Sequence, residues 1–130
     1  MEGLTMKENQ DRKVVVLGAS DKVERYGYKA MEKLLEQGFD AIPVNPEHEV
    51  ILGRKVFKSL TELTEQIDTL SVYLSAKRSS PLAQAILELA PGRVIFNPGA
   101  ENPELEQKLD EAGIAWLHAC TLVLLSTKRF

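Results

Sequence analysis

The sequence has little cysteine, no long apolar run and no excess of positive charge, and each shortage excludes a class of protein. Cys120 is the single cysteine among the 130 residues, so an internal disulfide cannot form. No stretch approaches the roughly 20 apolar residues that a membrane-spanning helix needs. The formal net charge of −3 argues against nucleic acid or a membrane surface as a partner, because both favour an excess of lysine and arginine. We therefore expect a cytoplasmic protein.

Metal-ligating residues are also scarce. His48, His118 and Cys120 have no spacing typical of a metal site, so we expect no metal. His118 and Cys120 are two residues apart, and one interpretation of this spacing is a thiolate–imidazole pair. The alternative is a cysteine that packs as a small apolar residue, which we favour because no third orienting group is evident. His48 lies in a polar loop and is expected to be solvated.

Length and composition are typical of a single soluble domain. Residues 1–12 are polar and lack periodicity, so we expect a flexible N-terminal leader followed by one domain over residues 13–130. Apolar runs typical of strands lie at residues 13–17, 41–44, 69–74, 93–96 and 114–117. Segments with helical spacing lie between them, at residues 26–35, 59–67, 80–89 and 102–112. The tail, residues 120–130, is compatible with a strand or a helix.

This alternation of strands and helices predicts an α/β fold with right-handed parallel crossovers. We expect a Rossmann-like three-layer sandwich around a mostly parallel sheet of five strands, or of six if the tail is a strand. Pro43 lacks a backbone N–H, so its strand is expected to be irregular or hydrogen-bonded on one side only.

The first strand ends in Gly18, Ala19 and Ser20, where ligands bind in such sheets. A glycine there permits close approach to the backbone, and the next helix directs free N–H groups to the same place. Ser20 offers a hydroxyl, and Lys22 and Arg25 offer charge. These features predict a phosphate-bearing nucleotide as the ligand.

The nicotinamide fingerprint G-x-G-x-x-G is absent, since Gly27 is the next glycine after Gly18. The second strand ends in Asn45 and Pro46, where a nicotinamide site usually has a carboxylate for the ribose hydroxyls. An uncharged Asn45 suits a phosphorylated ribose better. Lys77 and Arg78 precede a helix, and both a nearby anion and simple solvation explain them.

Several short motifs together resemble a known family. They are Gly18-Ala19-Ser20, Arg25-Tyr26-Gly27, Val44-Asn45-Pro46 and Ile51-Leu52-Gly53. In their order they resemble the small stand-alone coenzyme A-binding proteins, which are similar to the N-terminal domain of the succinyl-CoA synthetase alpha subunit. The resemblance covers about Lys13 to Cys120.

The resemblance implies a site for coenzyme A. Gly18, Ala19 and Ser20 would hold the diphosphate, and Arg25, Tyr26 and Gly27 would close around it. Asn45 and Pro46 would border the adenosine. The remaining implied residues follow the third and fourth strands: Leu74, Ser75 and Ala76, then Asn97, Pro98, Gly99 and Ala100. Relatives often have Asp-Arg before the final cysteine, whereas this chain has His118 and Ala119.

The resulting hypothesis is non-catalytic binding of coenzyme A or an acyl-CoA. A partner enzyme that supplies the chemistry is a further hypothesis. The alternatives are an NAD(P)-binding reductase-like protein and an acyl carrier that depends on Cys120. A phospho-receiver is disfavoured, because acidic residues are missing after the first and third strands.

Overall fold

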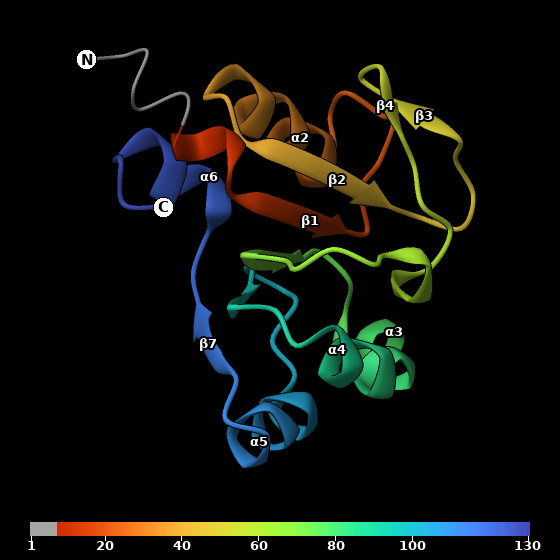
Figure 1. Ribbon diagram of the computed structural model, residues 1–130, viewed down its shortest axis with the longest axis vertical. Helices are drawn as coiled ribbons and strands as arrows, with labels where there is room; N and C mark the ends of the chain where they lie inside the picture. The colour runs from red at the N-terminus through yellow and green to blue at the C-terminus, as the bar shows by residue number, and fades with distance from the viewer. Residues whose placement is uncertain (1–7) are drawn as a thin grey trace.

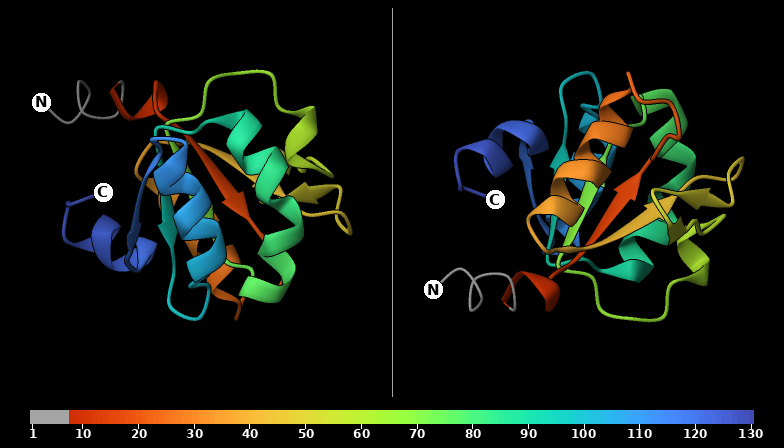
Figure 2. Two further views of the ribbon diagram at one scale, coloured as in Figure 1. Left: turned by 90° about the horizontal axis from the view of Figure 1, so that it is seen from below. Right: turned by 90° about the horizontal axis from the view of Figure 1, so that it is seen from above.

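The computed structural model describes residues 8–130 and consists of three layers, with a parallel sheet between two layers of helices (Figures 1 and 2). The sheet has the order β2-β1-β5-β6-β7. Helices α2 and α6 cover one face, and α3, α4 and α5 cover the other. The strands are β1 (Lys13–Leu17), β2 (Asp40–Val44), β5 (Thr69–Val72), β6 (Arg93–Phe96) and β7 (Ala115–His118). The helices are α2 (Tyr26–Glu36), α3 (Ala76–Ser79), α4 (Ala83–Leu89), α5 (Pro103–Glu111) and α6 (Thr121–Ser126). The predicted α/β Rossmann-like fold is confirmed.

The apolar runs form strands because the two faces of the sheet each need a partner for a hydrophobic core. In β1, Val14 and Val16 face the core under α2 and α6, while Val15 and Leu17 face the core under α4 and α5. All four side chains are buried. A strand buried on both faces must be apolar at consecutive positions, which is the pattern that the sequence shows.

The strand order places β1 between β2 and β5, so the chain reverses direction across the sheet at this point. The connection after β1 leads outward to β2, while β5 begins the run toward β7 on the other side. Loops that leave neighbouring strands in opposite directions open a crevice at the carboxyl ends of those strands. The loops after β1 and β5 are therefore where a ligand site is expected.

Pro43 is accommodated because β2 is an edge strand of the main sheet. Its carbonyl faces outward and accepts from the N–H of Phe57 at 3.0 Å, so its nitrogen also faces away from β1. Val44, the next residue, directs its carbonyl inward to the N–H of Gly18 at 3.1 Å. No hydrogen bond to β1 is lost. The expectation of an irregular strand, or of one bonded on one side only, is wrong, because β2 pairs in regular register with β1 and is also bonded to Phe57 on its outer edge.

Three predicted elements differ in the structure. The segment 59–67 forms only one 3-10 turn, η1 (Leu60–Glu62), which Ser59 caps by accepting from the N–H of Thr61. The helical run before β6 begins at Ala76, earlier than predicted. Pro81 lies in a 3-10 turn, η2 (Ser80–Leu82), between α3 and α4. The tail forms α6, so the main sheet has five strands.

A short hairpin follows β2 and was not predicted. It pairs β3 (Val50–Ile51) with β4 (Arg54–Lys55). The two turn residues, Leu52 and Gly53, both have positive φ, at 49° and 75°. A two-residue turn of this kind matches the twist of a hairpin. Arg54 then pairs with the carboxylate of Asp40, which attaches the hairpin to β2.

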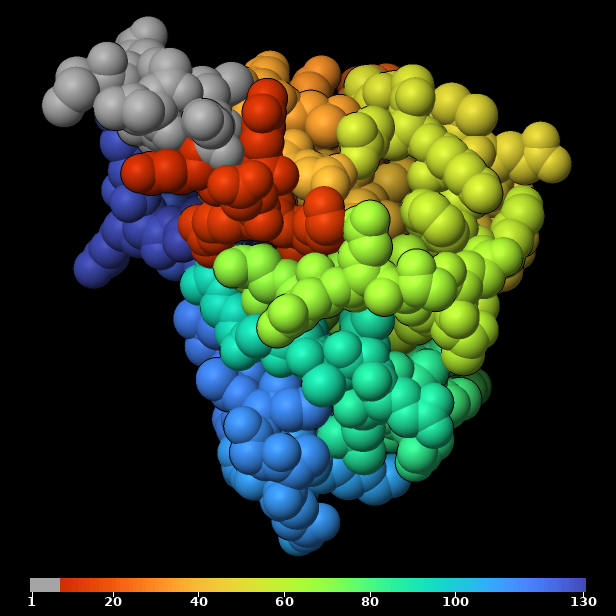
Figure 3. All heavy atoms as spheres, in the orientation of Figure 1, coloured from red at the N-terminus to blue at the C-terminus, as the bar shows by residue number. Residues whose placement is uncertain are grey.

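The first described residues lie beside the C-terminal residues (Figures 1 and 3). Arg12 donates to the backbone oxygen of Phe130 at 3.4 Å, and the side-chain nitrogen of Asn9 donates to the backbone carbonyl of Gln37 at 2.7 Å. Of the predicted leader, residues 1–7 lie outside the described residues, and residues 9 and 12 contact the domain. Within residues 8–130, no helix is long and apolar enough to cross a membrane.

Candidate functional site

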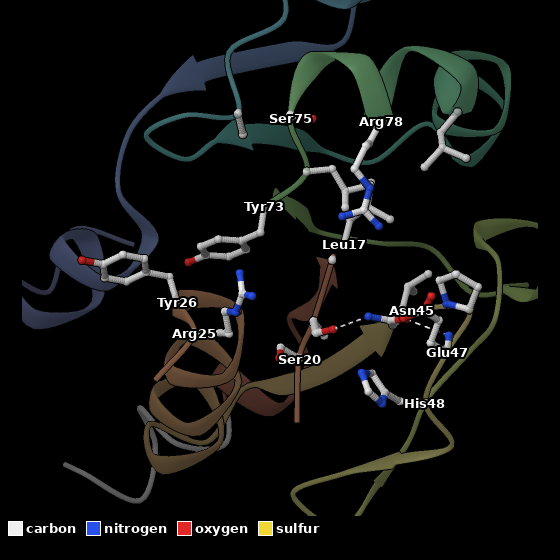
Figure 4. A pocket seen from close by; sticks show the side chains of 18 of the residues that line it. Leu17, Ser20, Arg25, Tyr26, Asn45, Glu47, His48, Tyr73, Ser75 and Arg78 are labelled. Atoms are coloured by element: carbon white, nitrogen blue, oxygen red, sulfur yellow. Dashed lines mark hydrogen bonds between the residues drawn. The ribbon is translucent and has the colours of Figure 1, made fainter. Parts of the chain in front are cut away.

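A cleft of about 840 Å³ opens at the carboxyl ends of β1, β2, β5 and β6. Its walls are the β1–α2 loop, the segments that follow β2 and β5, and the loop after β6 (Figure 4). The cleft therefore lies at the switch point that the strand order creates. Leu17, Leu60, Leu74 and Leu82 supply apolar surface at its floor.

The structure brings most of the predicted site residues together in this cleft. Ala76 and Asn97 are the two that do not line it. Those that line it are Gly18, Ala19, Ser20, Arg25, Tyr26, Gly27, Asn45, Pro46, Leu74, Ser75, Pro98, Gly99 and Ala100. Ala76 instead begins α3, and its carbonyl lies 3.4 Å from the side-chain nitrogen of Asn102.

Asn97 is buried and holds the sheet and α6 together below the cleft. Its side-chain nitrogen donates to Ser71 Oγ and to the carbonyl of Val72, both at 2.9 Å. Its side-chain oxygen accepts from the N–H of Thr121 at 2.8 Å. With these three bonds the amide is committed to the fold, so Asn97 positions the loop that follows it.

The β1–α2 loop is packed tightly through two glycines. Gly18 has a φ of +90°, and a Cβ there would lie 2.9 Å from the Leu74 side chain. The group that comes close to Gly18 is thus Leu74. A Cβ at Gly27 would lie 2.8 Å from the carbonyl oxygen of Gly18. The first turn of α2 consequently rests directly on the loop that ends β1.

The start of α2 leaves backbone donors free at the cleft. Arg25 occupies the N-cap position, and no side chain among residues 8–130 caps the helix. The first N–H groups of a helix have no acceptor within it, and the helix dipole adds positive potential there. Ser20 Oγ accepts from the N–H of Lys22 at 3.1 Å, which leaves the hydroxyl hydrogen of Ser20 available.

Asn45 ties two walls of the cleft to each other (Figure 4). Its side-chain nitrogen donates to the carbonyl of Ala19 at 2.7 Å, and its oxygen accepts from the N–H of Glu47 at 2.8 Å. Both halves of the amide are therefore used. Asn45 shapes the site by fixing the loop after β1 against the loop after β2.

Four cationic side chains line the cleft although the protein has a net charge of −3. They come from three segments: Lys22 and Arg25 from the β1–α2 loop, Lys58 from the segment before η1, and Arg78 from α3. Figure 4 shows Arg25 and Arg78 directed into the cleft from opposite walls. Within residues 8–130, neither of these two side chains forms a hydrogen bond or an ion pair. Such a cleft suits a ligand with several negative charges.

Sequence reasoning missed some of these residues. Lys58 was not singled out, and Arg78 was left open between solvation and anion binding. His48 was expected to be solvated, but its side chain is only 26% exposed, lines the cleft, and lies 3.6 Å from a carboxylate oxygen of Asp21. Lys58 donates to the carbonyl of His48 at 3.0 Å. His48 and Arg78 could have been found from their position just after predicted strands, whereas nothing in the sequence marked Lys58.

Tyr73 borders the cleft with a buried hydroxyl that has no hydrogen-bond partner in the described part of the chain. Burial raises the pKa of this phenol to about 12. The nearby hydroxyls of Thr121 and Ser71 lower the pKa of Tyr73 somewhat, and Cys120 raises it further. Tyr73 therefore stays neutral at physiological pH.

His118 and Cys120 do not form the thiolate–imidazole pair. His118 contacts Glu106 of α5, whereas Cys120 is half-buried at the start of α6 near Tyr73. Neither residue lines the cleft. Trp116 is half-buried on the edge strand β7, and its indole N–H donates to Asp110 at 2.8 Å.

Comparison with known proteins decides the family. The sequence profile of the CoA binding domain matches residues 12–126, which is most of the chain. The chain belongs to the CoA binding domain family. The resemblance seen in its motifs is thereby confirmed.

The curated relatives of this chain include a protein of similar length and a much longer enzyme. The chain is 29% identical over 104 residues to an uncharacterized protein, YneT, of Bacillus subtilis, covering 80% of this chain and 77% of that one. It is 30% identical over 105 residues to an acetate–CoA ligase (ADP-forming) of Methanocaldococcus jannaschii. That match covers 77% of this chain but only 15% of the ligase.

Solved structures give the same fold. A crystal structure of an uncharacterized protein has a TM-score of 0.85 at 38% identity, covering 92% of this chain and 98% of that one. A hypothetical protein from Pyrococcus horikoshii has a TM-score of 0.84 at 28% identity, covering 98% and 94%.

The residues of the cleft fit the coenzyme that the family name implies. Coenzyme A carries a diphosphate and a ribose phosphate on a nucleoside, followed by a long, largely apolar arm. The uncapped start of α2 and the four cationic side chains suit the phosphates, and the leucines of the floor suit the arm.

Proposed function

We propose that this cleft binds coenzyme A or an acyl-CoA, and that the protein has no complete catalytic set of its own. The observation that carries the proposal is the gathering of four cationic side chains around an uncapped helix start in an acidic protein. Because Arg25 and Arg78 have no hydrogen-bond or ion-pair partner among residues 8–130, their charge is available to a ligand. Domains that hold nucleotides at a switch point place phosphates at this loop.

The proposed roles follow the walls of the cleft. The loop after β1 and the start of α2 hold the diphosphate, and the loop after β2 borders the adenosine. The segments after β5 and β6 flank the pantetheine arm. In that order the proposed binding residues are Gly18, Ala19, Ser20, Arg25, Tyr26 and Gly27; Asn45 and Pro46; Leu74 and Ser75; and Pro98, Gly99 and Ala100. Ala76 and Asn97 lie behind the wall and support it.

The alternatives have less support. This chain lacks the fingerprint glycines that a nicotinamide-dependent reductase has. The side-chain amide of Asn45 is also already hydrogen-bonded to Ala19 and Glu47. An acyl carrier would need Cys120 at the cleft, where it does not lie. A partner enzyme that supplies catalysis is part of the proposal, since the matched ligase is a much longer chain.

Calorimetry with three ligands tests the proposal. We expect coenzyme A to bind more tightly than dephospho-coenzyme A, and NAD to bind weakest. Arg78→Gln removes a charged hydrogen bond worth about 1.5–3 kcal/mol, so the Kd for coenzyme A should rise roughly 10-fold to 100-fold.

Lys108→Gln is the matched control, because Lys108 is an exposed cation on α5 that pairs with Glu104 at 3.6 Å. Its Kd should equal that of the wild type. Equal or absent binding of the three ligands to the wild-type protein would refute the proposal.

A further inference from the structure

The carboxyl end of β7 carries a second group of reactive side chains, outside the lining of the cleft. His118 Nε2 lies 2.8 Å from Glu106 Oε2. Glu106 is only 6% exposed, and the same oxygen accepts from the N–H of Asn102 at 2.8 Å. The start of α5 therefore holds the carboxylate in place, and the carboxylate in turn orients the imidazole.

This geometry leaves one nitrogen of His118 as a proton acceptor. A carboxylate accepts only, so Nε2 carries the hydrogen and Nδ1 carries the lone pair. The ring also packs on Trp116 at 5.2 Å and on Phe96 at 6.2 Å. The side chain is 49% exposed, and within the described residues nothing is bonded to Nδ1. A histidine oriented by a buried carboxylate with its second nitrogen free is the arrangement of a general base.

The position of His118 relates this base to the cleft. His118 is the register partner of Phe96, so it lies level with the start of the loop after β6. Pro98, Gly99 and Ala100 of that loop line the cleft. Glu101, in the same loop, accepts from the N–H of Gly99 and lies near enough to His118 for their charges to interact. The end of β7 thus continues the edge of the sheet at which the cleft opens.

The distance from the phosphate loop to His118 suits the coenzyme. Neighbouring strands are about 4.8 Å apart, so three steps from β1 to β7 span roughly 14 Å. The pantetheine arm contains two amide bonds and resembles about four extended residues, which also span roughly 14 Å. A coenzyme with its diphosphate at the β1–α2 loop and its arm across β5 and β6 would present its thiol at the end of β7.

We propose that His118, oriented by Glu106, accepts the thiol proton of coenzyme A. This inference rests on the proposed function. The S–H bond breaks, the proton is transferred to Nδ1, and the electron pair stays on sulfur. Glu106 then faces a positively charged imidazolium, and no oxidant or co-reactant is consumed. His118 would thereby prepare the thiol for an acyl donor that a partner enzyme supplies.

The test measures the ionisation of the bound thiol directly. The ultraviolet absorbance of the thiolate is followed against pH in the coenzyme A complex, in a Cys120→Ser background so that the coenzyme has the sole thiol. Free coenzyme A, titrated alone under the same conditions, gives the ordinary midpoint of this thiol. We expect the midpoint in the complex to lie about one pH unit lower, and to return toward the ordinary value in His118→Gln.

Two further variants distinguish a base from a structural contact. Glu106→Gln keeps an acceptor for the N–H of Asn102 but loses the charge, so the midpoint should rise while folding is retained. Glu104 is an exposed carboxylate on the same helix, and Glu104→Gln should leave the midpoint of thiol ionisation unchanged. The charged groups that face His118 are Glu101 and Glu106. A Glu101→Gln variant measures how much Glu101 contributes to the midpoint of thiol ionisation.

The outcomes separate this inference from the proposed function. If calorimetry detects no binding of coenzyme A to the wild type, the proposed function fails. If coenzyme A binds wild type and His118→Gln alike, and its thiol ionises at the same pH in both complexes, only the role of His118 is refuted.

Discussion

One methyl group at Gly27 should perturb both the fold and the cleft. Gly27 is the second residue of α2 and is buried against the loop that ends β1. A Cβ there would lie 2.8 Å from the carbonyl oxygen of Gly18, 3.4 Å from the Cα of Ala19 and 3.5 Å from the nitrogen of Ser20. All three neighbours are backbone atoms, so no side-chain rotation relieves the contact. In Gly27→Ala, either α2 or the phosphate loop must move.

The size of the effect follows from two opposing terms. In a helix, alanine is favoured over glycine by up to about 1 kcal/mol. Overpacking that forces a backbone shift costs about 1–3 kcal/mol, and a contact with fixed backbone lies toward the upper end. We therefore expect Gly27→Ala to lower the free energy of unfolding by about 1–2 kcal/mol. Displacement of the loop should also weaken coenzyme A binding about tenfold, or about 1.4 kcal/mol.

Urea unfolding and calorimetry measure the two effects, and Gly113→Ala is the matched control. Gly113 has a φ of +74° with nothing within 4 Å of an added Cβ, and it lies after α5, away from the cleft. Alanine there should cost about 1 kcal/mol through backbone strain and leave the Kd unchanged. The reasoning is refuted if Gly27→Ala is as stable as the wild type, or if both variants bind coenzyme A equally.

Two other predictions concern single contacts. Asn45→Asp keeps an acceptor for the N–H of Glu47 but places an oxygen against the carbonyl of Ala19, so urea unfolding should show a loss of about 1–3 kcal/mol. Burial opposes ionisation of Asp68, but hydrogen bonds from Thr69 and Arg12 outweigh it and lower the pKa of this carboxyl. A depressed pKa stabilises the fold above the unfolded value and loses that contribution as pH falls through the folded value. Asp68→Asn should therefore be less stable than the wild type at neutral pH, with a difference that shrinks below about pH 4, and an unchanged difference in acid would contradict this.

Local pattern was enough to find the strands and the main helices. The run from Val14 to Leu17 and the helix from Tyr26 to Glu36 have apolar spacing that only one kind of element can bury. Pro43 indicated a strand bonded on one side only, but the outer edge of β2 is bonded to Phe57 as well. Local pattern failed where tertiary contacts outweighed it. The segment after Ser59 has a cap but only one 3-10 turn, and α3 begins at Ala76 although Pro81 is the stronger signal.

The sequence by itself determined the fold class and the position of the candidate site, because alternating strands and helices allow few topologies and the ligand edge of such a sheet is set by its strand order. Tertiary structure alone decided the charge of the cleft and the partners of each side chain. Lys58, Arg78 and His48 come from separate segments, and only folding shows that they line the same cleft as Arg25. The same holds for His118, which is twelve residues from Glu106 in the chain and 2.8 Å from it in the fold. Contacts of this kind depend on how helices pack on the sheet, which local sequence spacing does not encode.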